Sequence, residues 1–528
     1  MTDAKIAIIG SGIVGVSVAH HLTENGHAVD MFEKGDDYPY PHNPQWEDIY
    51  LRRREAVHVM ADFRLPDDLK HHTHSGLQTD IEATRHMWVG GSSTHWEAIT
   101  PRMIEADFRA GTTYGIGDDW PLSYDDLERY YGMAERLIGV AGTDDDNPTA
   151  PPRSTPYPLP PFELADDDNV LAERLADAGI TLHTTPQART RQAYDGRQAC
   201  VNFNTCAYCP IGARYSPGIH LSRAIAGGLC HLRTGVTVRR IVPDADGDGA
   251  TVVYRDNDGA DDITAHYDVV VICAGAVETA RLLLLSADER HPDGLGNRSG
   301  HVGRGLTFHH TWRGELGYDQ NLFPGRTGVW TGQIMQFMEA DGRGTHGAVK
   351  VEFSSRLEQR GVGRLRWEHL PDAQAVVDEL TMIRRTRPLA MVTEVAPSEQ
   401  KYVMLSEATD RFGDPFAHVH YEMNDLDSAT YDFALSIFQR IRDATRASTG
   451  FLSPFQMWDT AAHHMGTARM SEAVADGVVN SFGQLHDAPP VFALGGSMFV
   501  GSGGAVNPTL TMIALALRSA EYIESQLL

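Results

Sequence analysis

The chain has little cysteine, only five of its 528 residues. Secreted domains held together by disulfides use cysteine far more densely, so such a framework is excluded. Long apolar runs are also missing: Val269–Ala274 and Met512–Leu517 fall well short of the roughly 18 residues that a membrane-spanning helix needs. The N-terminus lacks a basic segment followed by an apolar stretch and a small-residue cleavage site. We therefore expect a cytoplasmic protein with no membrane partner.

Positive charge is scarce as well. Lys and Arg together number 45 against 71 Asp and Glu, which gives a formal net charge of −26. A surface of this sign repels phosphate backbones, so we expect no nucleic-acid partner. The acids gather in short blocks such as 144–146 and 166–168, a pattern typical of solvated loops.

The N-terminal segment carries a nucleotide-binding fingerprint. An apolar strand, Ile6–Ile9, is followed by Gly10, Gly12 and Gly15 in the register G-x-G-x-x-G, and then by a helical pattern. Glycines in this turn let a pyrophosphate approach the helix N-terminus, where free amides favour negative charge. A second strand ends at Glu33, whose carboxylate is placed to accept hydrogen bonds from a ribose. The fingerprint predicts FAD or NAD without distinguishing between them.

The rest of the chain shows two kinds of pattern. Apolar, β-branched runs typical of buried parallel strands occur near both ends and at 269–274. Between residues 310 and 450 the patterns favour antiparallel strands and helices, including an amphipathic helix with Ala434 to Ala444 on one stripe and Gly450 past its end. A final helix opens at Pro508. We therefore predict an α/β protein with two interleaved domains.

Four further segments identify a family. They read VGGSSTHWEAITPRM at 89–103, VVVICAGAVETARLLLL at 269–285, HHMGTARM at 463–470 and LGGSMFVGSGGAVNPTLT at 494–511. With the N-terminal fingerprint, they resemble the glucose–methanol–choline family of FAD oxidoreductases, in the family's order and at suitable separations. Within that family, the STHW string at 93–96 is similar to pyranose oxidases and glycoside 3-oxidase-type enzymes.

The resemblance implies a Rossmann-like FAD-binding domain interleaved with a substrate-binding domain built on an antiparallel sheet and helices. The FAD-binding domain would comprise residues 1–100, 195–310 and 455–528, and the substrate-binding domain residues 101–194 and 311–454. The implied cofactor-binding residues are Gly10, Gly12, Gly15, Glu33, Ser93, His95, Val238, Gly275, Pro508 and Thr509. A helix N-terminus at Pro508 would also stabilise the negative charge that a flavin gains on reduction.

The same resemblance implies that His463 and Asn507 are catalytic. Oxidising an alcohol requires removal of its hydroxyl proton while a hydride leaves the same carbon for the flavin. An imidazole has a pKa near 6.5 and can accept that proton at neutral pH. Asn507 can orient the alcohol oxygen through its amide. The neighbouring His464 is interpreted as a supporting or packing residue.

Two cofactor questions stay open at this point. In relatives with a segment similar to the STHW string, the histidine of that segment carries a covalent link to the flavin. His95 therefore either forms such a link or stacks beside FAD without one. Cys200, Cys206 and Cys209 resemble the loop of iron–sulfur-bearing sugar dehydrogenases. The last gap is one residue shorter, however, and an adjacent second cysteine is missing. Because zinc normally needs four ligands, we assign no metal.

The expected function is FAD-dependent oxidation of a secondary alcohol of a sugar or glycoside to a keto-sugar. O₂ is the expected electron acceptor, because the STHW string is similar to oxidases and the cysteine loop departs from the cluster-bearing dehydrogenases. A dehydrogenase that uses a quinone or a protein acceptor is the alternative. A lyase that keeps FAD without a redox role is a more remote one.

Overall fold

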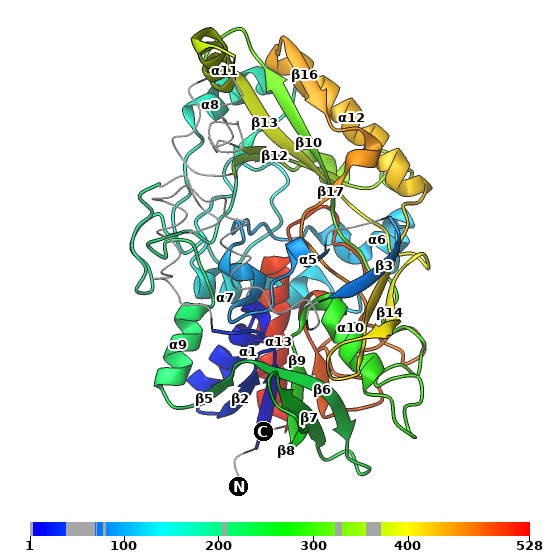
Figure 1. Ribbon diagram of the computed structural model, residues 1–528. Coiled ribbons are helices and arrows are strands. Elements are labelled where there is room, and N and C mark those ends of the chain that lie inside the picture. Colours follow the sequence, from blue (N-terminus) through cyan, green and yellow to red (C-terminus); the bar gives the residue numbers. More distant parts are fainter. Residues whose placement is uncertain are drawn as a thin grey trace.

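The computed structural model describes residues 4–37, 69, 71–77, 81–202, 209–322, 330–354 and 371–527. The molecule is elongated, with a parallel sheet at one end and a larger antiparallel sheet at the other (Figure 1). Both chain ends lie near the parallel sheet, away from the antiparallel one.

The parallel sheet draws its strands from the start, the middle and the end of the chain. Its order is β18-β9-β1-β2-β5, and every neighbouring pair is parallel. The strands are β1 (Ile6–Ile9), β2 (Val29–Phe32), β5 (Cys230–Arg233), β9 (Val269–Ile272) and β18 (Val491–Ala493). All residues of β1 and β9 are buried, as expected for strands covered on both faces.

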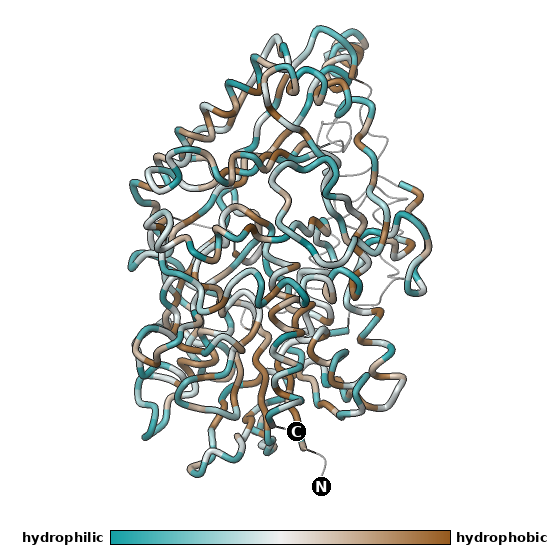
Figure 2. Tube along the Cα trace, turned by 180° about the vertical axis from the view of Figure 1, so that it is seen from behind, coloured by the Kyte–Doolittle hydropathy of each residue, from teal (hydrophilic) through white to brown (hydrophobic). Residues whose placement is uncertain are grey.

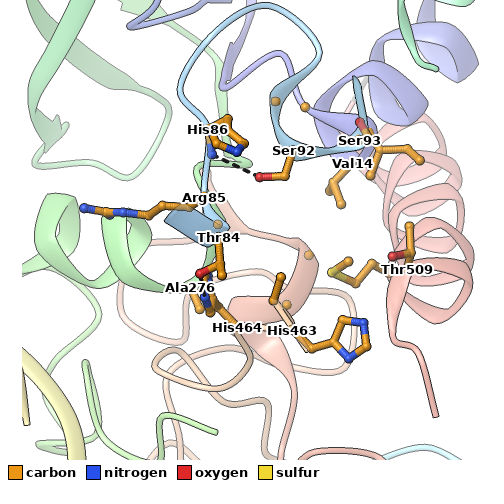
Figure 3. Close-up of a pocket in the computed structure, with 18 of the residues that line it drawn as sticks. Val14, Thr84, Arg85, His86, Ser92, Ser93, Ala276, His463, His464 and Thr509 are labelled. Atoms are coloured by element: carbon orange, nitrogen blue, oxygen red, sulfur yellow. Dashed lines mark hydrogen bonds between the residues drawn. The ribbon is translucent and has the colours of Figure 1, made fainter. Parts of the chain in front are cut away.

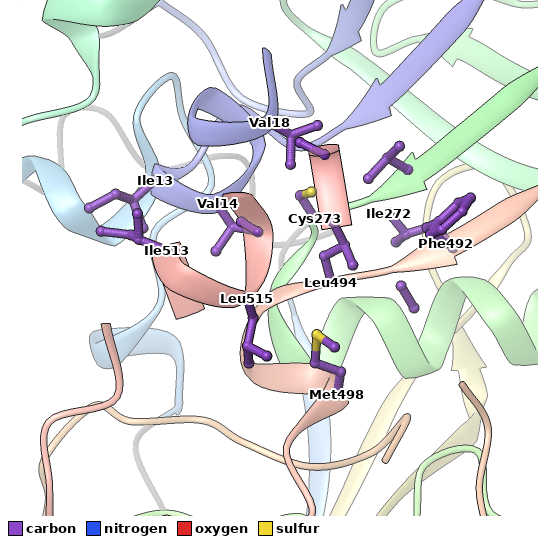
Figure 4. Packing of buried hydrophobic residues seen from close by; sticks show 14 of the residues in the cluster. Ile13, Val14, Val18, Ile272, Cys273, Phe492, Leu494, Met498, Ile513 and Leu515 are labelled. Carbon is purple, nitrogen blue, oxygen red and sulfur yellow. The ribbon is translucent and has the colours of Figure 1, made fainter. Parts of the chain in front are cut away.

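Helices cover this sheet. Helix α1 (Ile13–Glu24) packs against α13 (Thr509–Leu527) and α9 (Gly218–Ala226), while α7 (Tyr124–Ile138) packs on α13. Apolar side chains of α1, α13, β9 and β18 meet in one core (Figure 4). Strand β9 leads almost directly into α10 (Gly275–Leu285), as β1 leads into α1. Helix N-termini therefore gather at the carboxyl edge of the sheet, which suits a bound anion.

The antiparallel sheet has seven strands in the order β16-β10-β13-β12-β11-β4, with β17 paired to β10. The strands are β4 (His183–Thr184), β10 (His310–Gly317), β11 (Trp330–Ile334), β12 (Val349–Ser354), β13 (Thr386–Thr393), β16 (Thr449–Leu452) and β17 (Asp459–Thr460). Helices α8 (Asp166–Ala176) and α12 (Asp425–Thr445) bury apolar side chains in the core that this sheet shares. Helix α11 (Ala373–Arg385) precedes β13 and buries only Ile383.

Two small sheets and two short helices complete the fold. One sheet has the order β14-β15-β3 and the other β6-β7-β8. Their bounds are β3 (His72–Gly76), β6 (Val236–Pro243), β7 (Ala250–Asp256), β8 (Ile263–Tyr267), β14 (Lys401–Thr409) and β15 (Pro415–Tyr421), and the helices are α5 (Ile81–Thr84) and α6 (Ala110–Tyr114). Apolar residues concentrate in the central strands and helices near the chain ends (Figure 2). In the described ranges, no helix combines the length and apolar composition needed to cross a bilayer.

The predicted fold class is confirmed, because the parallel strands come from the start, middle and end of the chain around an antiparallel segment. The predicted amphipathic helix is confirmed as α12, which buries Ala434, Ile437, Phe438 and Ile441. Helix α12 ends at Thr445, and Arg446 adopts the left-handed conformation at φ +58°. Gly450 lies past that end, as predicted, and pairs with β10 as part of β16. The domain boundaries at residues 100, 194, 310 and 454 stay a prediction.

Candidate active site

One cavity of about 860 Å³ is lined by residues of both large sheets. Its walls include the β1–α1 loop, the N-termini of α10 and α13, strands β10 and β12, and the loop that carries His463. Figure 3 shows His463 and His464 at one end and His86, Ser92 and Ser93 at the other, with the His86 amide bonded to Ser92. The cavity therefore runs from the carboxyl edge of the parallel sheet to the antiparallel sheet.

The glycines of the first loop have separate roles. Gly10 has φ +104°, in the region that favours glycine, and a side chain there would meet the carbonyl of Cys273. A Cβ on Gly15 would lie 2.1 Å from the carbonyl oxygen of Gly10, so Gly15 permits the helix to pack on the loop. A Cβ on Gly12 would meet no described atom within 4 Å, and Gly12 lines the cavity. Gly12 therefore leaves space that a ligand can use.

Glu33 lies at the end of β2, where the sequence placed it. Its Oε2 accepts hydrogen bonds from Ser11 N at 3.0 Å and Ser11 Oγ at 2.6 Å, and its Oε1 accepts one from Gly35 N at 3.0 Å. The side chain is buried and lines the cavity. These bonds hold a negative charge at the edge of the nucleotide loop.

Ser93 and His95 belong to a tight turn beside the nucleotide loop, where Gly90 N donates to the carbonyl of Ser11 at 3.1 Å. Ser93 Oγ donates to the carbonyl of Gly90 at 2.6 Å, and the Arg214 guanidinium donates to the carbonyls of Ser93 and Trp96 at 3.1 and 2.8 Å. Burial, helped by His86 and Arg214, lowers the pKa of His95 well below 6.5. Its buried Nε2 finds no hydrogen-bond partner within the part of the chain that the structure describes. His95 therefore presents a neutral ring with an unsatisfied nitrogen.

The remaining predicted cofactor residues also line this cavity. Val238 lies on β6, and Gly275 opens α10 at φ +72°, where a Cβ would meet no described atom within 4 Å. Pro508 and Thr509 form the start of α13. The structure thus brings together, around one cavity, predicted cofactor-binding residues that are separated by up to several hundred positions.

His463 lies at the far end of the cavity from the STHW turn. Its Nδ1 is 2.8 Å from His309 Nδ1. Burial is the main reason that the pKa of His463 lies well below 6.5, and His309 and Lys350 lower it further. The adjacent His464 contacts Thr84 Oγ1 at 3.0 Å, and burial lowers its pKa to about 3. At neutral pH both rings are neutral, so His463 has a lone pair available.

Asn507 lies between the helix start and a buried ion pair. Lys350 Nζ donates to Asn507 Oδ1 and lies 2.5 Å from Glu352 Oε1. Lys350 is fully buried, and Glu352 and Asn507 line the cavity. Because its oxygen is occupied by Lys350, the amide of Asn507 keeps its N–H groups as donors for a ligand.

His309, Lys350 and Glu352 were not found by sequence reasoning. The signal for the last two was present, because Lys350 and Glu352 stand two apart in an apolar strand and must share one face. A buried Lys–Glu pair in such a strand is costly, which makes it a candidate for function. His309 had no comparable local signal, since it immediately precedes β10 beside a second histidine.

None of the described residues of the cysteine loop lines this cavity. Cys200 and Cys209 are half-buried, while Cys206 lies outside the described residues. Among the residues that are described, no group of three or more His, Cys, Asp or Glu side chains is arranged to hold a metal.

Comparison with known proteins identifies the chain. The N-terminal model of the GMC oxidoreductases matches residues 89–311, the C-terminal model matches residues 397–516, and a model for FAD dependent oxidoreductases matches residues 5–42. The chain belongs to the GMC oxidoreductase family. This GMC oxidoreductase is thus an FAD-dependent enzyme that acts on CH–OH groups.

Relatives of this GMC oxidoreductase match over nearly its whole length. A 2-methyl-1,2-propanediol dehydrogenase of Mycolicibacterium austroafricanum is 30% identical, over 99% of this chain and 95% of its own. The fructose dehydrogenase large subunit of Gluconobacter japonicus is 27% identical, over 99% and 98% respectively. The crystal structure of pyridoxine 4-oxidase from Mesorbium loti shares the fold, with a TM-score of 0.67 at 17% identity and 99% coverage of both chains.

The residues of the cavity fit FAD. Open space at Gly12 and Gly275, next to helix N-termini, matches a pyrophosphate and its negative charge. The carboxylate of Glu33 suits a ribose hydroxyl. The unsatisfied Nε2 of His95 and the start of α13 at Pro508 line the same continuous space, where an isoalloxazine would provide the missing contact.

Proposed function

We propose that this GMC oxidoreductase oxidises a secondary alcohol of a sugar or glycoside to a ketone, with His463 as the base. The observation that carries the proposal is that His463 and Asn507 line the same cavity as the nucleotide loop. A substrate at this end of the cavity would lie between a neutral imidazole and an amide donor.

Asn507 and His463 have separate roles in the proposed reaction. Asn507, its oxygen held by Lys350, donates an N–H to the alcohol oxygen and fixes the position of the carbinol carbon. His463 accepts the hydroxyl proton, and its lowered pKa keeps the ring unprotonated and ready to do so at neutral pH. Bound FAD supplies the acceptor for the hydride that leaves the same carbon, so that a C=O bond replaces the C–H and O–H bonds.

The cavity walls support a polyhydroxylated substrate. Thr311, Arg313 and Glu352 line the end formed by the antiparallel sheet, together with the apolar Trp330 and Val392. A few polar groups on an apolar surface can form hydrogen bonds with particular hydroxyl groups of a sugar, while an aromatic side chain packs on the sugar ring. The likeness to a fructose dehydrogenase large subunit points to the same class of substrate.

O₂ is the proposed electron acceptor. The similarity of the STHW turn to oxidases supports it, and His463 would leave the first half-reaction protonated, a positive charge that favours reduction of O₂ in an enclosed site. The names of the two dehydrogenase relatives favour a second candidate, an enzyme that passes electrons to a quinone or a protein. Reoxidation rates of the reduced enzyme in air-saturated buffer and with quinones decide between them.

The experiment is anaerobic mixing of the FAD-loaded enzyme with a panel of monosaccharides, glycosides and simple alcohols. Bleaching of the flavin band by a sugar or glycoside, with a ketone located by NMR, is the expected result. His463→Ala should slow that bleaching at least about 100-fold while FAD stays bound. Bleaching only by simple alcohols would contradict the substrate class, and an unchanged rate in His463→Ala would contradict the assigned base.

A further inference from the structure

Two histidine rings meet at the end of the cavity. His463 Nδ1 and His309 Nδ1 are 2.8 Å apart, and the ring planes cross at 87°. Two ring nitrogens at this distance share one hydrogen, so one ring must donate and the other accept. His309 is fully buried.

The second nitrogen of His309 decides the direction of this bond. Its Nε2 lies 3.1 Å from the carbonyl oxygen of Ser502 and 3.0 Å from that of Gly504. Carbonyl oxygens only accept, so His309 Nε2 carries a hydrogen. Burial, with Lys350 nearby, lowers the pKa of His309 to about 3, so the ring is neutral at pH 7. Its Nδ1 therefore has no hydrogen and accepts one from His463.

We propose that His309 is a positioning residue that holds His463 in the Nδ1–H tautomer and so leaves the Nε2 lone pair as the proton acceptor. This inference rests on the proposed function of His463. In the opposite tautomer, the lone pair of His463 Nδ1 would face the lone pair of His309, and Nε2 would already carry a proton. As at many histidine sites, the hydrogen-bond partner of one ring nitrogen determines whether the other nitrogen carries a proton.

The charged and titratable neighbours of the pair are Lys350, His464 and His310. Lys350 on β12 lowers the pKa of both rings, and His464 in the same loop as His463 lowers that of His463. Backbone carbonyls from the segment before α13 face the other edge of His309. Among the described residues, His309 is the hydrogen-bond partner found for His463 Nδ1.

A matched pair of variants tests the inference. Asn and Leu have nearly the same shape, but His309→Asn keeps an acceptor oxygen near the position of Nδ1, whereas His309→Leu removes it. The first measurement is ¹⁵N-histidine NMR of the FAD-loaded protein, with His463→Ala used to assign the signals. We expect the Nδ1–H tautomer of His463 in the unmodified protein and in His309→Asn, and the Nε2–H tautomer in His309→Leu.

The second measurement is the rate of flavin reduction by the best sugar from the panel. His309→Leu should lower the limiting rate about 10- to 100-fold, with little change in the sugar concentration at half-maximal rate, and His309→Asn should restore most of the loss. FAD content and the thermal midpoint identify variants that fail to fold. If a variant fails to fold, the tautomer of His463 in the unmodified protein, measured by NMR, tests the inference.

Three outcomes overturn the inference. They are an Nε2–H tautomer of His463 in the unmodified protein, an unchanged tautomer in His309→Leu, and equal slowing by both variants. If His463→Ala itself reduces the flavin at full rate, the proposed function fails. If His463→Ala is slow but His309→Leu is not, only the inference about His309 fails.

Discussion

At the scale of single residues, the site depends on side chains that orient other side chains. An asparagine amide has two nearly equivalent ends, and the contact from Lys350 to Asn507 Oδ1 settles which end faces the cavity. Lys350 is itself held 2.5 Å from Glu352, so the positive charge is paired where it is buried. One buried ion pair therefore specifies a donor at the position where the alcohol oxygen is proposed to bind.

Replacing Lys350 removes that orientation. Lys350→Met should slow flavin reduction by sugar about 10- to 100-fold, the loss expected for one charge-assisted hydrogen bond. Because the single variant leaves Glu352 unpaired, Lys350→Met combined with Glu352→Gln is the control that separates lost orientation from an uncompensated charge. Stopped-flow absorbance measures the rates. If the double variant regained the full rate, Asn507 would not need Lys350.

His95 makes a second prediction at this scale. Its buried Nε2 has no described partner and His95 lines the cavity, so we propose that this nitrogen is covalently bonded to the flavin. We expect yellow flavin to stay with the protein after acid precipitation, and to be released from His95→Ala, which should still bind FAD. Fluorescence of the denatured band in a gel is the measurement. Release from the unmodified enzyme would indicate a ring that only packs beside FAD.

At the scale of elements, two glycines of one loop should respond differently to the same change. A methyl group at Gly15 meets the Gly10 carbonyl at 2.1 Å, whereas one at Gly12 points into open cavity. Gly15→Ala should lower the stability of the FAD-free protein, by the few kcal/mol typical of forced overpacking. Gly12→Ala should leave that stability nearly unchanged and weaken FAD binding. Urea unfolding and FAD titration of both variants check the contrast, and a stable Gly15→Ala would argue against tight β1–α1 packing.

The distance along the chain between interacting residues explains which site residues could be predicted from the sequence. Some site residues lie in short motifs whose geometry is set by neighbouring residues, so the motif is enough to place them. Gly12 and Gly275 lie in strand–turn–helix motifs, and Ser93 lies in a tight turn. His309 and Lys350 act through partners 154 and 157 positions away. Their roles depend on the register of β10, β12 and β13, which no local pattern reveals. The residue that caps α12 was not predicted either: Arg446 takes the left-handed position, while Gly450 pairs with β10 inside β16.

At the scale of the whole molecule, buried histidines should make the fold sensitive to acid. Burial lowers the pKa of His309 to about 3 and that of His310 well below 6.5. The unfolded chain takes up these protons near pH 6.5 and the folded chain does not, so stability falls as the pH drops through 6.5. Each such histidine adds up to about 1.4 kcal/mol per pH unit to the slope. His463 and His464 act in the same direction.

Carboxyls whose pKa is raised by burial oppose this trend, and they include Asp107, Asp144 and Asp168. Burial raises the pKa of Asp107 to about 6, so the folded state binds that proton first and gains stability as the pH falls below 6. Because the histidines with a lowered pKa outnumber these carboxyls, the urea midpoint of the FAD-loaded protein should be clearly lower at pH 5.5 than at pH 7.5. Equal midpoints at the two values would mean that the histidines are protonated in the folded state.

The packing of α1 against α13 has a consequence for how the protein is made. The two helices are separated by almost the whole chain, and Pro508 and Thr509 at the start of α13 line the cofactor cavity. A ribosome that adds about 5–20 residues per second delivers α13 roughly 25 to 100 s after α1. During that interval the nascent chain carries an uncovered apolar helix and an incomplete flavin site. Cofactor acquisition must therefore follow translation of the last helix, and yield should depend on chaperones that shield α1 until then.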